Sequence, residues 1–300
     1  MDLSSEIREL KEEKNAVILA HNYQISEIQD VADLTGDSLE LSRKASETDA
    51  EIIVFAGVDF MAQTAKVLSP EKTVLMPSRE ARCPMACMLE KDDILKAKQQ
   101  YPDADVVLYV NTLAEHKALA DCVCTSANAD RVVNAMDSET VVFGPDMNLA
   151  YYVEKRTQKK LIRIPEKGYC HAHTHMSLED LQRAKQQHPE ALVVVHPECI
   201  PKIQEKADHI ASTSGMLKYC RQSPEKEFII GTETGMLYPL QKQMPGKKFY
   251  PLADTAICSD MKKNTMEGIM NALKTGQHEV MLPEEIVTKS QKAIRRMLEL

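Results

Sequence analysis

The sequence predicts an α/β protein built from three similar units, each a three-layer α/β/α sandwich with a small parallel sheet. Short apolar runs rich in Val, Ile and Leu alternate with amphipathic stretches along the whole chain, which is typical of parallel strands and their connecting helices. An Ala-Asp pair recurs at Asp33, Asp121 and Asp208, with spacings of 88 and 87 residues. Because further features recur in the same register, triplication is the simplest explanation.

The features that share this register are mostly polar residues at the ends of apolar runs. Two of the sets follow the first run of each copy, and the others come later in the copy. In order they are His21, Tyr109 and His196; Tyr23, Asn111 and Glu198; Ser38, Ser126 and Thr213; Gly57, Gly144 and Gly231; and Cys83, Cys170 and Cys258.

A period of this length is too long for a solenoid repeat and lies in the size range of small domains. We therefore expect three units, 1–100, 101–188 and 189–276, each with its own core and related by pseudo-threefold symmetry. The remainder, 277–300, is predicted to be a C-terminal amphipathic helix that packs across the units.

The first copy opens with the apolar run 17–20, whose β-branched members predict a buried strand. Ser26 and Gln29 have capping-box spacing, and the apolar periodicity up to Gly36 predicts a helix and its stop. A short strand and four longer elements follow in alternation. These are a helix over 39–45 capped by Asp37 and Ser38, a strand over 52–56, a helix over 60–68 capped by Asp59, and a strand over 74–76 that leads to Cys83.

The second copy repeats this order, and the third follows it as far as Cys258. The second copy's elements are a strand over 106–110, a helix from Thr112 with Glu115 at capping-box spacing, a helix headed by Ser126, a strand over 141–143, a helix from Asp146, and a strand over 161–164.

Composition excludes several classes of protein. The net charge is −8 and no long basic run is present, which argues against nucleic acid or an anionic membrane as the main partner. The chain shows neither a secretory signal pattern nor an apolar run long enough to span a membrane. We expect a cytoplasmic protein whose eight cysteines are reduced thiols available for metal or catalysis.

The recurring polar residues all follow strands. Ligands of parallel α/β sheets gather beyond the carboxyl ends of the strands. If the three units surround a common axis, these residues converge on one central site between the units.

Three cysteines are in repeat register: Cys83, Cys170 and Cys258. Three thiolates that converge from three units suit a [4Fe-4S] cluster with one iron left open. A zinc site and three simply buried thiols are the alternatives. The other five cysteines have no counterparts and are expected to be small buried hydrophobic residues: Cys87, Cys122, Cys124, Cys199 and Cys220.

His171, His173 and His175 would share one face of an extended segment, so they could form a separate metal site. Because they directly follow Cys170, we favour one of them lining the substrate cavity instead.

The predicted central site also offers acid and base groups. An open iron acts as a Lewis acid, and around it the chain places imidazoles, phenols, an amide and one carboxylate, which can move protons in a confined space. Ser38, Ser126 and Thr213 stand where helices are expected to begin, so they could bind a carboxylate or phosphate. Plain helix capping is the alternative interpretation.

The motifs around these residues resemble those of the quinolinate synthase family, enzymes of de novo NAD biosynthesis, over nearly the whole chain. The motifs are Ala20-His21-Asn22-Tyr23-Gln24, Gly36-Asp37-Ser38, Gly57-Val58-Asp59-Phe60-Met61-Ala62, Tyr109-Val110-Asn111, Thr125-Ser126-Ala127-Asn128, Gly144-Pro145-Asp146, His196-Pro197-Glu198-Cys199 and Gly231-Thr232-Glu233. The resemblance implies a triangular three-domain fold and a [4Fe-4S] cluster on Cys83, Cys170 and Cys258. It implies condensation of iminoaspartate with dihydroxyacetone phosphate to quinolinate, with loss of phosphate and two waters.

The resemblance also implies roles for single residues. Tyr23, Glu198, His173 and His196 are the expected catalytic residues, with His173 lining the cavity. The expected substrate-binding residues are His21, Ser38, Tyr109, Asn111, Ser126, His196, Glu198 and Thr213. An aspartate-oxidising enzyme is a candidate partner because it would supply iminoaspartate. The segment Ser259-Asp260-Met261-Lys262 after the third cysteine departs from the family's usual Asn-Met-Lys.

Two other functions compete with this prediction. One is a non-enzymatic iron-sulfur electron carrier or sensor, although such carriers normally hold their cluster with four cysteines. The other is a zinc-stabilised binding protein for a small dicarboxylate.

Overall fold

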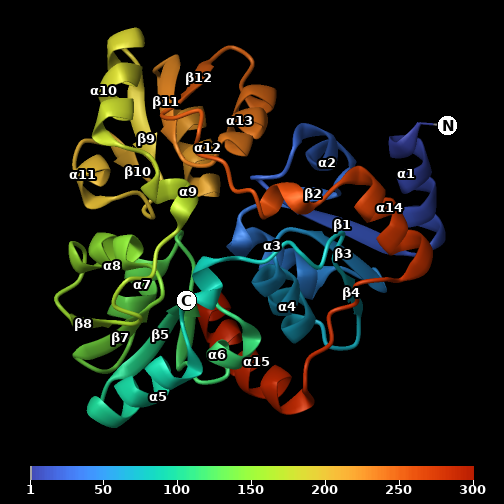
Figure 1. Ribbon diagram of the computed structural model, residues 1–300, viewed down its shortest axis with the longest axis horizontal. Coiled ribbons are helices and arrows are strands. Elements are labelled where there is room, and N and C mark those ends of the chain that lie inside the picture. The colour runs from blue at the N-terminus through green and yellow to red at the C-terminus, as the bar shows by residue number, and fades with distance from the viewer. Residues whose placement is uncertain (1) are drawn as a thin grey trace.

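The computed structural model describes residues 2–300 and contains three separate four-stranded sheets around a common centre (Figure 1). Every strand pairing within these sheets is parallel. The strand order is the same in each: β2-β1-β3-β4, β6-β5-β7-β8 and β10-β9-β11-β12. Helices separate the strands in sequence. The predicted α/β class with three parallel sheets is confirmed.

The strands are β1 (Ala16–His21), β2 (Leu34–Gly36), β3 (Ile52–Ala56), β4 (Thr73–Leu75), β5 (Asp105–Tyr109), β6 (Cys122–Cys124), β7 (Thr140–Gly144), β8 (Lys160–Arg163), β9 (Leu192–Val195), β10 (His209–Ile210), β11 (Glu227–Gly231) and β12 (Lys248–Pro251). The α-helices are α1 (Leu3–Glu13), α2 (Ser26–Val31), α3 (Ser38–Glu47), α4 (Asp59–Leu68), α5 (Lys91–Gln100), α6 (Ala114–Lys117), α7 (Ala129–Asn134), α8 (Met147–Glu154), α9 (His171–Thr174), α10 (Leu178–Gln187), α11 (Pro201–Gln204), α12 (Thr213–Gln222), α13 (Leu237–Gln243), α14 (Met266–Thr275) and α15 (Glu284–Glu299). Three short 3₁₀ helices are η1 (Met85–Cys87), η2 (Thr234–Met236) and η3 (Met261–Lys263).

Both predicted capping boxes are wrong. Ser26 is the first residue of α2, and its hydroxyl donates to the Glu27 carboxylate at 2.9 Å. The Thr112 hydroxyl donates to the Tyr109 carbonyl at 3.0 Å, and α6 begins only at Ala114. In each case the hydroxyl bonds a nearby acceptor instead of a backbone N–H of the helix, which is the usual competition for Ser and Thr.

The recurring aspartates fasten the start of each first strand. Each carboxylate accepts the backbone N–H of a residue in the first strand, and the aspartate's own N–H donates to the carbonyl of the same residue. The pairs are Asp33 with Ile18, Asp121 with Val106 and Asp208 with Val193, with N to Oδ2 distances of 2.8, 2.8 and 2.7 Å. We call these three pairs the aspartate clasps.

In the first two repeats, the last helix packs on the sheet that follows it in the chain. Ile94 and Ala97 of α5 share a core with the second sheet, and Leu181 and Ala184 of α10 share one with the third. The expected boundaries after residues 100 and 188 assign α5 to the first unit and α10 to the second. In the structure, each of these helices packs on the sheet of the next unit.

The equivalent helix of the third repeat, α14, closes the ring. The helices α5, α10 and α14 begin at residues 91, 178 and 266, so α14 is in register with the other two. Its residues Ile269, Ala272 and Leu273 share a core with β1 and β3 of the first sheet. Figure 1 shows α14 beside the N-terminal helix α1. The segment expected to end the third unit therefore covers the first one.

The C-terminal helix α15 matches the expected amphipathic helix. Its buried residues Ala293, Ile294 and Met297 join a core that contains residues of both the first and the second sheet, such as Val74 and Val123. Of the helices described, none has the length and apolar character that crossing a membrane requires.

Candidate active site

A central cavity lies where the carboxyl ends of the three sheets meet. It encloses about 660 Å³ of space, including open solvent at its mouth. Every residue predicted for the site lines it except His173. The lining residues are His21, Tyr23, Asp37, Ser38, Val58, Phe60, Met61, Cys83, Tyr109, Asn111, Thr125, Ser126, Cys170, Ala172, His196, Glu198, Thr213, Cys258 and Met261.

The three cysteines in register occupy equivalent local structures. Each lies one to three residues before the start of a short helical turn, and the backbone N–H three residues later donates to its sulfur. These donors belong to Ala86, His173 and Met261. Burial raises the pKa of Cys83 and of Cys170 well above the ordinary value, and it also raises the pKa of Cys258. Such thiols ionise when a metal binds them, and backbone N–H donors stabilise the resulting thiolates.

A carboxylate holds the backbone of each of these cysteines. It comes from the loop or helix start after the third strand of the same unit and accepts the cysteine's N–H. The pairs are Cys83 with Asp59 at 3.0 Å, Cys170 with Asp146 at 3.2 Å and Cys258 with Glu233 at 3.2 Å. These carboxylates were not among the predicted site residues, although their spacing of 87 residues and their place two residues after the recurring glycines could have identified them.

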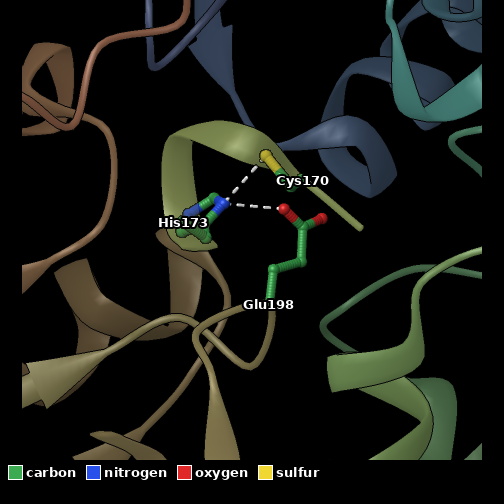
Figure 2. Close-up of side chains that lie close together, drawn as sticks. All are labelled: Cys170, His173 and Glu198. Carbon is green, nitrogen blue, oxygen red and sulfur yellow. Dashed lines mark hydrogen bonds and ion pairs between the residues drawn. The ribbon is translucent and has the colours of Figure 1, made fainter. Parts of the chain in front are cut away.

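Glu198 is the centre of a buried hydrogen-bond network. Its Oε1 accepts the Tyr109 hydroxyl at 2.5 Å, and its Oε2 lies 2.8 Å from His173 Nδ1. Figure 2 shows His173 between this carboxylate and the Cys170 sulfur, which is 3.1 Å from Nδ1. Burial opposes ionisation of Glu198, but the neighbouring His173 and His196 and the Tyr109 hydroxyl outweigh burial and lower its pKa. The carboxylate is therefore ionised at neutral pH.

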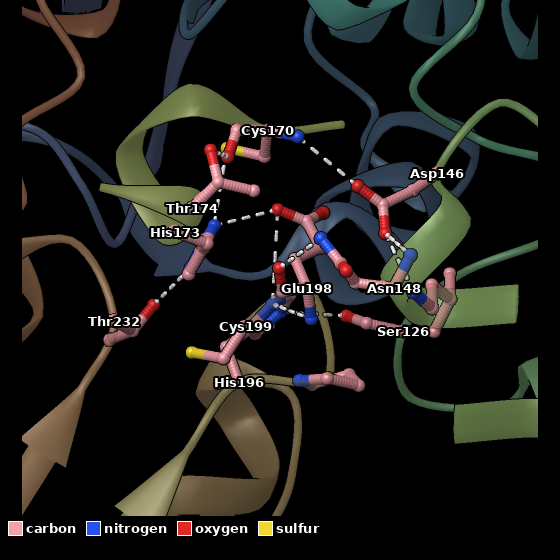
Figure 3. Close-up of polar contacts among 12 residues, drawn as sticks. Ser126, Asp146, Asn148, Cys170, His173, Thr174, His196, Glu198, Cys199 and Thr232 are labelled. Atoms are coloured by element: carbon pink, nitrogen blue, oxygen red, sulfur yellow. Dashed lines mark hydrogen bonds and ion pairs between the residues drawn. The ribbon is translucent and has the colours of Figure 1, made fainter. Parts of the chain in front are cut away.

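The network continues through His173 to a second tyrosine. His173 Nε2 lies 2.9 Å from Thr232 Oγ1 (Figure 3). That oxygen lies 2.6 Å from the Tyr23 hydroxyl. A continuous path thus joins Tyr109, Glu198, His173, Thr232 and Tyr23. Burial and the charge of Glu198 raise the pKa of both tyrosines well above the ordinary value. His173 lies in this path rather than on the cavity wall, and Thr232 was not predicted.

His21 and His196 are oriented in the same way in two different units. The Nδ1 of His21 accepts the N–H of Tyr23 at 3.2 Å, and the Nδ1 of His196 accepts that of Glu198 at 3.3 Å. Both Nε2 atoms are left to act as donors, and that of His196 lies 3.2 Å from Ser126 Oγ (Figure 3). Burial lowers the pKa of each imidazole to about 3, so both are neutral at pH 7.

The three predicted hydroxyls all line the cavity, but their relation to helix starts differs. Ser38 and Thr213 are the first residues of α3 and α12. The helix after Ser126 begins only at Ala129, because the Asn128 side chain accepts the Thr125 N–H and forms a turn first. That part of the prediction is wrong.

The hydroxyls have unlike neighbours. Thr213 accepts a hydrogen bond from Asn22 at 2.9 Å. The first N–H groups of α3 are occupied by the Asp37 carboxylate, which accepts from Leu39 and Glu40 at 3.0 Å. Backbone N–H groups at the start of α3 are therefore already satisfied by the protein.

A second recurring position fixes the loops that carry the site residues. Gln29 donates to the carbonyls of Asn22 and Gln24, and Gln204 donates to those of Pro197 and Cys199. The equivalent residue of the second unit is Lys117, whose fully buried ammonium group donates to the Thr112 carbonyl. Burial lowers the pKa of Lys117 to about 7. The sequence alone does not reveal this recurring position, because the second unit has lysine where the other two units have glutamine.

The remaining cysteines and histidines follow the predictions only in part. Cys122, Cys124, Cys199 and Cys220 are buried as expected. Cys87 is exposed at the end of η1, so its predicted burial is wrong. The segment from His171 to His175 is helical, not extended, which separates inward-facing His173 from the other two.

Within residues 2–300, two groups of side chains could hold a metal ion. One contains Cys170, His173 and Glu198, and the other contains His171, Cys258 and Asp260. The potential ligand atoms of each group lie within 4.8 Å of one another.

Comparisons with known proteins agree with the geometry. A family model described as quinolinate synthetase A protein matches residues 5–299. The chain is 57% identical over 300 residues to the quinolinate synthase of Pyrococcus horikoshii, covering 100% of this chain and 99% of that protein. It is 57% identical over 303 residues to that of Methanocaldococcus jannaschii, with 99% of each chain covered. A relative from Thermodesulfovibrio yellowstonii is 51% identical over 295 residues, covering 98% and 97%.

Proposed function

The chain belongs to the quinolinate synthetase A family, and we propose that it condenses iminoaspartate with dihydroxyacetone phosphate to form quinolinate, releasing phosphate and two waters. The observation that carries this proposal is the single cavity that receives three thiols and a set of acid, base and hydroxyl side chains from all three units. The full-length relatives named quinolinate synthase support the same activity. An aspartate-oxidising enzyme is the proposed source of iminoaspartate.

We propose that Cys83, Cys170 and Cys258 hold a [4Fe-4S] cluster. The donor set fits, because three thiols line one cavity and a backbone N–H donates to each sulfur. Three cysteines ligate three of four irons, which leaves one iron open. When bound, the cluster supplies a Lewis acid that polarises a hydroxyl or carboxylate of the substrate.

Neutral polar groups bind the substrate carboxylates in this proposal. The Nε2 donors of His21 and His196 and the hydroxyls of Ser38, Ser126 and Thr213 line the cavity, and Tyr109 and Asn111 lie among them. Hydrogen-bond donors that carry no net charge can hold anions in a buried site. This is consistent with a protein whose net charge is −8.

The buried network provides the proton transfers. With Glu198 ionised, His173 donates from Nδ1 to this carboxylate, so its Nε2 can accept from Thr232, which in turn accepts from Tyr23. Tyr23 can then take a proton from the substrate as its own proton moves toward His173. At the other end of the network, Tyr109 can donate its proton to a departing hydroxyl group as His173 passes one to Glu198 and Glu198 returns one to Tyr109.

The deciding experiment measures quinolinate formation by anaerobically purified, cluster-reconstituted protein supplied with dihydroxyacetone phosphate and freshly generated iminoaspartate. An iron-stripped sample serves as the control. We expect product only from the reconstituted sample. A verified [4Fe-4S] cluster without product would contradict the proposed reaction and favour the electron-carrier alternative.

A further inference from the structure

A second group of metal-ligand side chains lies beside the third cysteine. It consists of one nitrogen of His171, the sulfur of Cys258 and one oxygen of Asp260, all within 4.8 Å of one another. His171 starts α9, whereas Cys258 and Asp260 lie in the loop before η3. Sulfur, imidazole nitrogen and carboxylate oxygen are the ligand types of zinc and similar divalent ions.

Hydrogen bonding does not account for this group. In the trio of Cys170, His173 and Glu198, His173 Nδ1 lies 3.1 Å from the sulfur and 2.8 Å from the carboxylate, so those contacts hold the trio together. By contrast, the ring nitrogens of His171 have no hydrogen-bond partner within residues 2–300. The imidazole, thiol and carboxylate of the second group are close together without bonds that join them.

The charges around the group leave room for a cation. Burial raises the pKa of the Cys258 thiol, while the backbone N–H groups of Met261 and Asp260 that donate to its sulfur can stabilise the thiolate once a metal displaces the proton. Asp260 is 9% exposed, and Lys263 lies 2.7 Å from its Oδ1. That ammonium group occupies one oxygen of Asp260 and leaves the other for a metal. Cys258 and His171 are half-buried, so an ion can reach them from solvent.

We infer that the cluster-free chain binds one divalent transition ion of the zinc class on His171, Cys258 and Asp260. Ligands on a tetrahedral zinc ion are about 3.5 Å apart, so the side chains need to close by about 1 Å. A water molecule completes the four-coordinate site. Because Cys258 is also a proposed cluster ligand, the bound ion withholds that thiolate from the cluster.

Cobalt(II) is the probe for this site, because cobalt bound to a thiolate gives a charge-transfer absorption. The full-length chain, stripped of iron under anaerobic conditions, is titrated with cobalt. We expect one equivalent to bind with the thiolate signal. His171→Ala should weaken binding by at least about 10-fold, since even residues that only support a metal ligand are worth that factor. Asp260→Asn, which keeps the shape of the side chain, should weaken binding in the same direction.

Two variants serve as controls. His175→Ala removes the neighbouring histidine, whose ring centroid is 6.1 Å from that of His171, and should leave cobalt binding unchanged. Cys83→Ala should also leave it unchanged, because that sulfur is not part of the proposed site. Loss of the signal in Cys83→Ala, with full binding in His171→Ala, would overturn the inference and place the ion among the three cysteines.

A second measurement tests the competition and rests on the proposed cluster. Zinc added before iron and sulfide should slow cluster formation in the original chain by more than in His171→Ala. Equal slowing in both would contradict the competition. A chain that forms no cluster in the absence of zinc would count against the proposed function, while the cobalt titration would still decide whether this site exists.

Discussion

The two ends of the three sheets differ in how alike the units are. At the amino end, the same residue makes the same contact three times, in the aspartate clasps. At the carboxyl end, equivalent positions carry Tyr23, Asn111 and Glu198, which have three different side chains. Two sets at that end are identical in all units: the three cysteines, and the glycines Gly57, Gly144 and Gly231 that end or follow the third strands.

This difference separates the residues that build the framework from those that perform the chemistry. A contact that stabilises one unit works equally well in the other two, so it can remain the same in all of them. The two proposed substrates do not have threefold symmetry, so equivalent positions around the central cavity need unlike groups. The repeated fold brings equivalent positions to the cavity, and sequence divergence between the units gives each position a side chain with different acid, base or hydrogen-bonding chemistry.

The largest expected effect comes from the identical set at the centre. Cys170→Ala should lose iron and quinolinate formation together, because two thiolates cannot hold the proposed cluster. Cys220→Ala, which removes a buried cysteine without a counterpart in the other units, should lose neither. Iron content and product formation are measured on the same samples. Full activity of an iron-free Cys170→Ala sample would contradict the proposed mechanism.

Next in size is the carboxylate at the centre of the buried network. Glu198→Gln keeps the shape but removes the charge that accepts from Tyr109 and His173, and we expect turnover to fall by about 100-fold or more. Glu205→Gln is the matched control, because Glu205 accepts an exposed tyrosine hydroxyl, that of Tyr151, at 2.5 Å. Steady-state turnover of both variants is compared. An equal loss of turnover in the two variants would contradict a catalytic role that is specific to Glu198.

The clasps should affect stability and leave chemistry alone. Asp33→Ala, Asp121→Ala and Asp208→Ala should each lower the free energy of unfolding by about 1 to 2 kcal/mol, since each loses the charged hydrogen bond of its clasp; Asp33→Ala also loses the ion pair with Lys11 at the surface. The exposed Asp103 makes no side-chain hydrogen bond within residues 2–300, so Asp103→Ala is the control. Denaturant unfolding and turnover are measured together. A clasp variant with normal stability and impaired turnover would contradict the assignment of stability to the amino ends of the sheets and of chemistry to their carboxyl ends.

The smallest effect is expected at Thr232, which joins His173 to Tyr23. Thr232→Val keeps the size and removes both hydrogen bonds of the hydroxyl, each worth about 1 kcal/mol, which corresponds to a loss in turnover of roughly 5- to 30-fold. Thr232→Ser should restore most of the rate and the pH profile of the original chain. If the serine variant were as slow as the valine variant, packing of the methyl group would explain the loss better than the relay.

The strands and the central convergence could be predicted from the sequence. The six strands predicted in the first two copies with explicit ranges all end within one residue of those observed, such as β3 over Ile52–Ala56. The apolar runs of five of them are mostly buried, and only the edge strand β8 is half-buried, so the period and the bounds are visible in the sequence. The register also identified twelve residues that line the cavity.

What the sequence did not show depends on contacts between distant segments. The path from Tyr23 to Glu198 runs through Thr232 and His173, which are brought together only when the units dock. The starts of α2 and α6 were misjudged because a hydroxyl near a helix has several acceptors within reach. The carboxylates Asp59, Asp146 and Glu233 were visible in the register, but only the structure shows that each holds a cysteine backbone.

The return of α14 to the first sheet affects how the chain can fold during synthesis. Ile18 and Val54 emerge from the ribosome early, but Ile269 and Leu273, which complete their core, are made near the end. The second sheet, by contrast, receives the helix α5 that covers one face before its own strands are made, and only its other face waits for α15. Domains that complete early can fold while translation continues. The part of this protein that is synthesised first is therefore among the last to be finished.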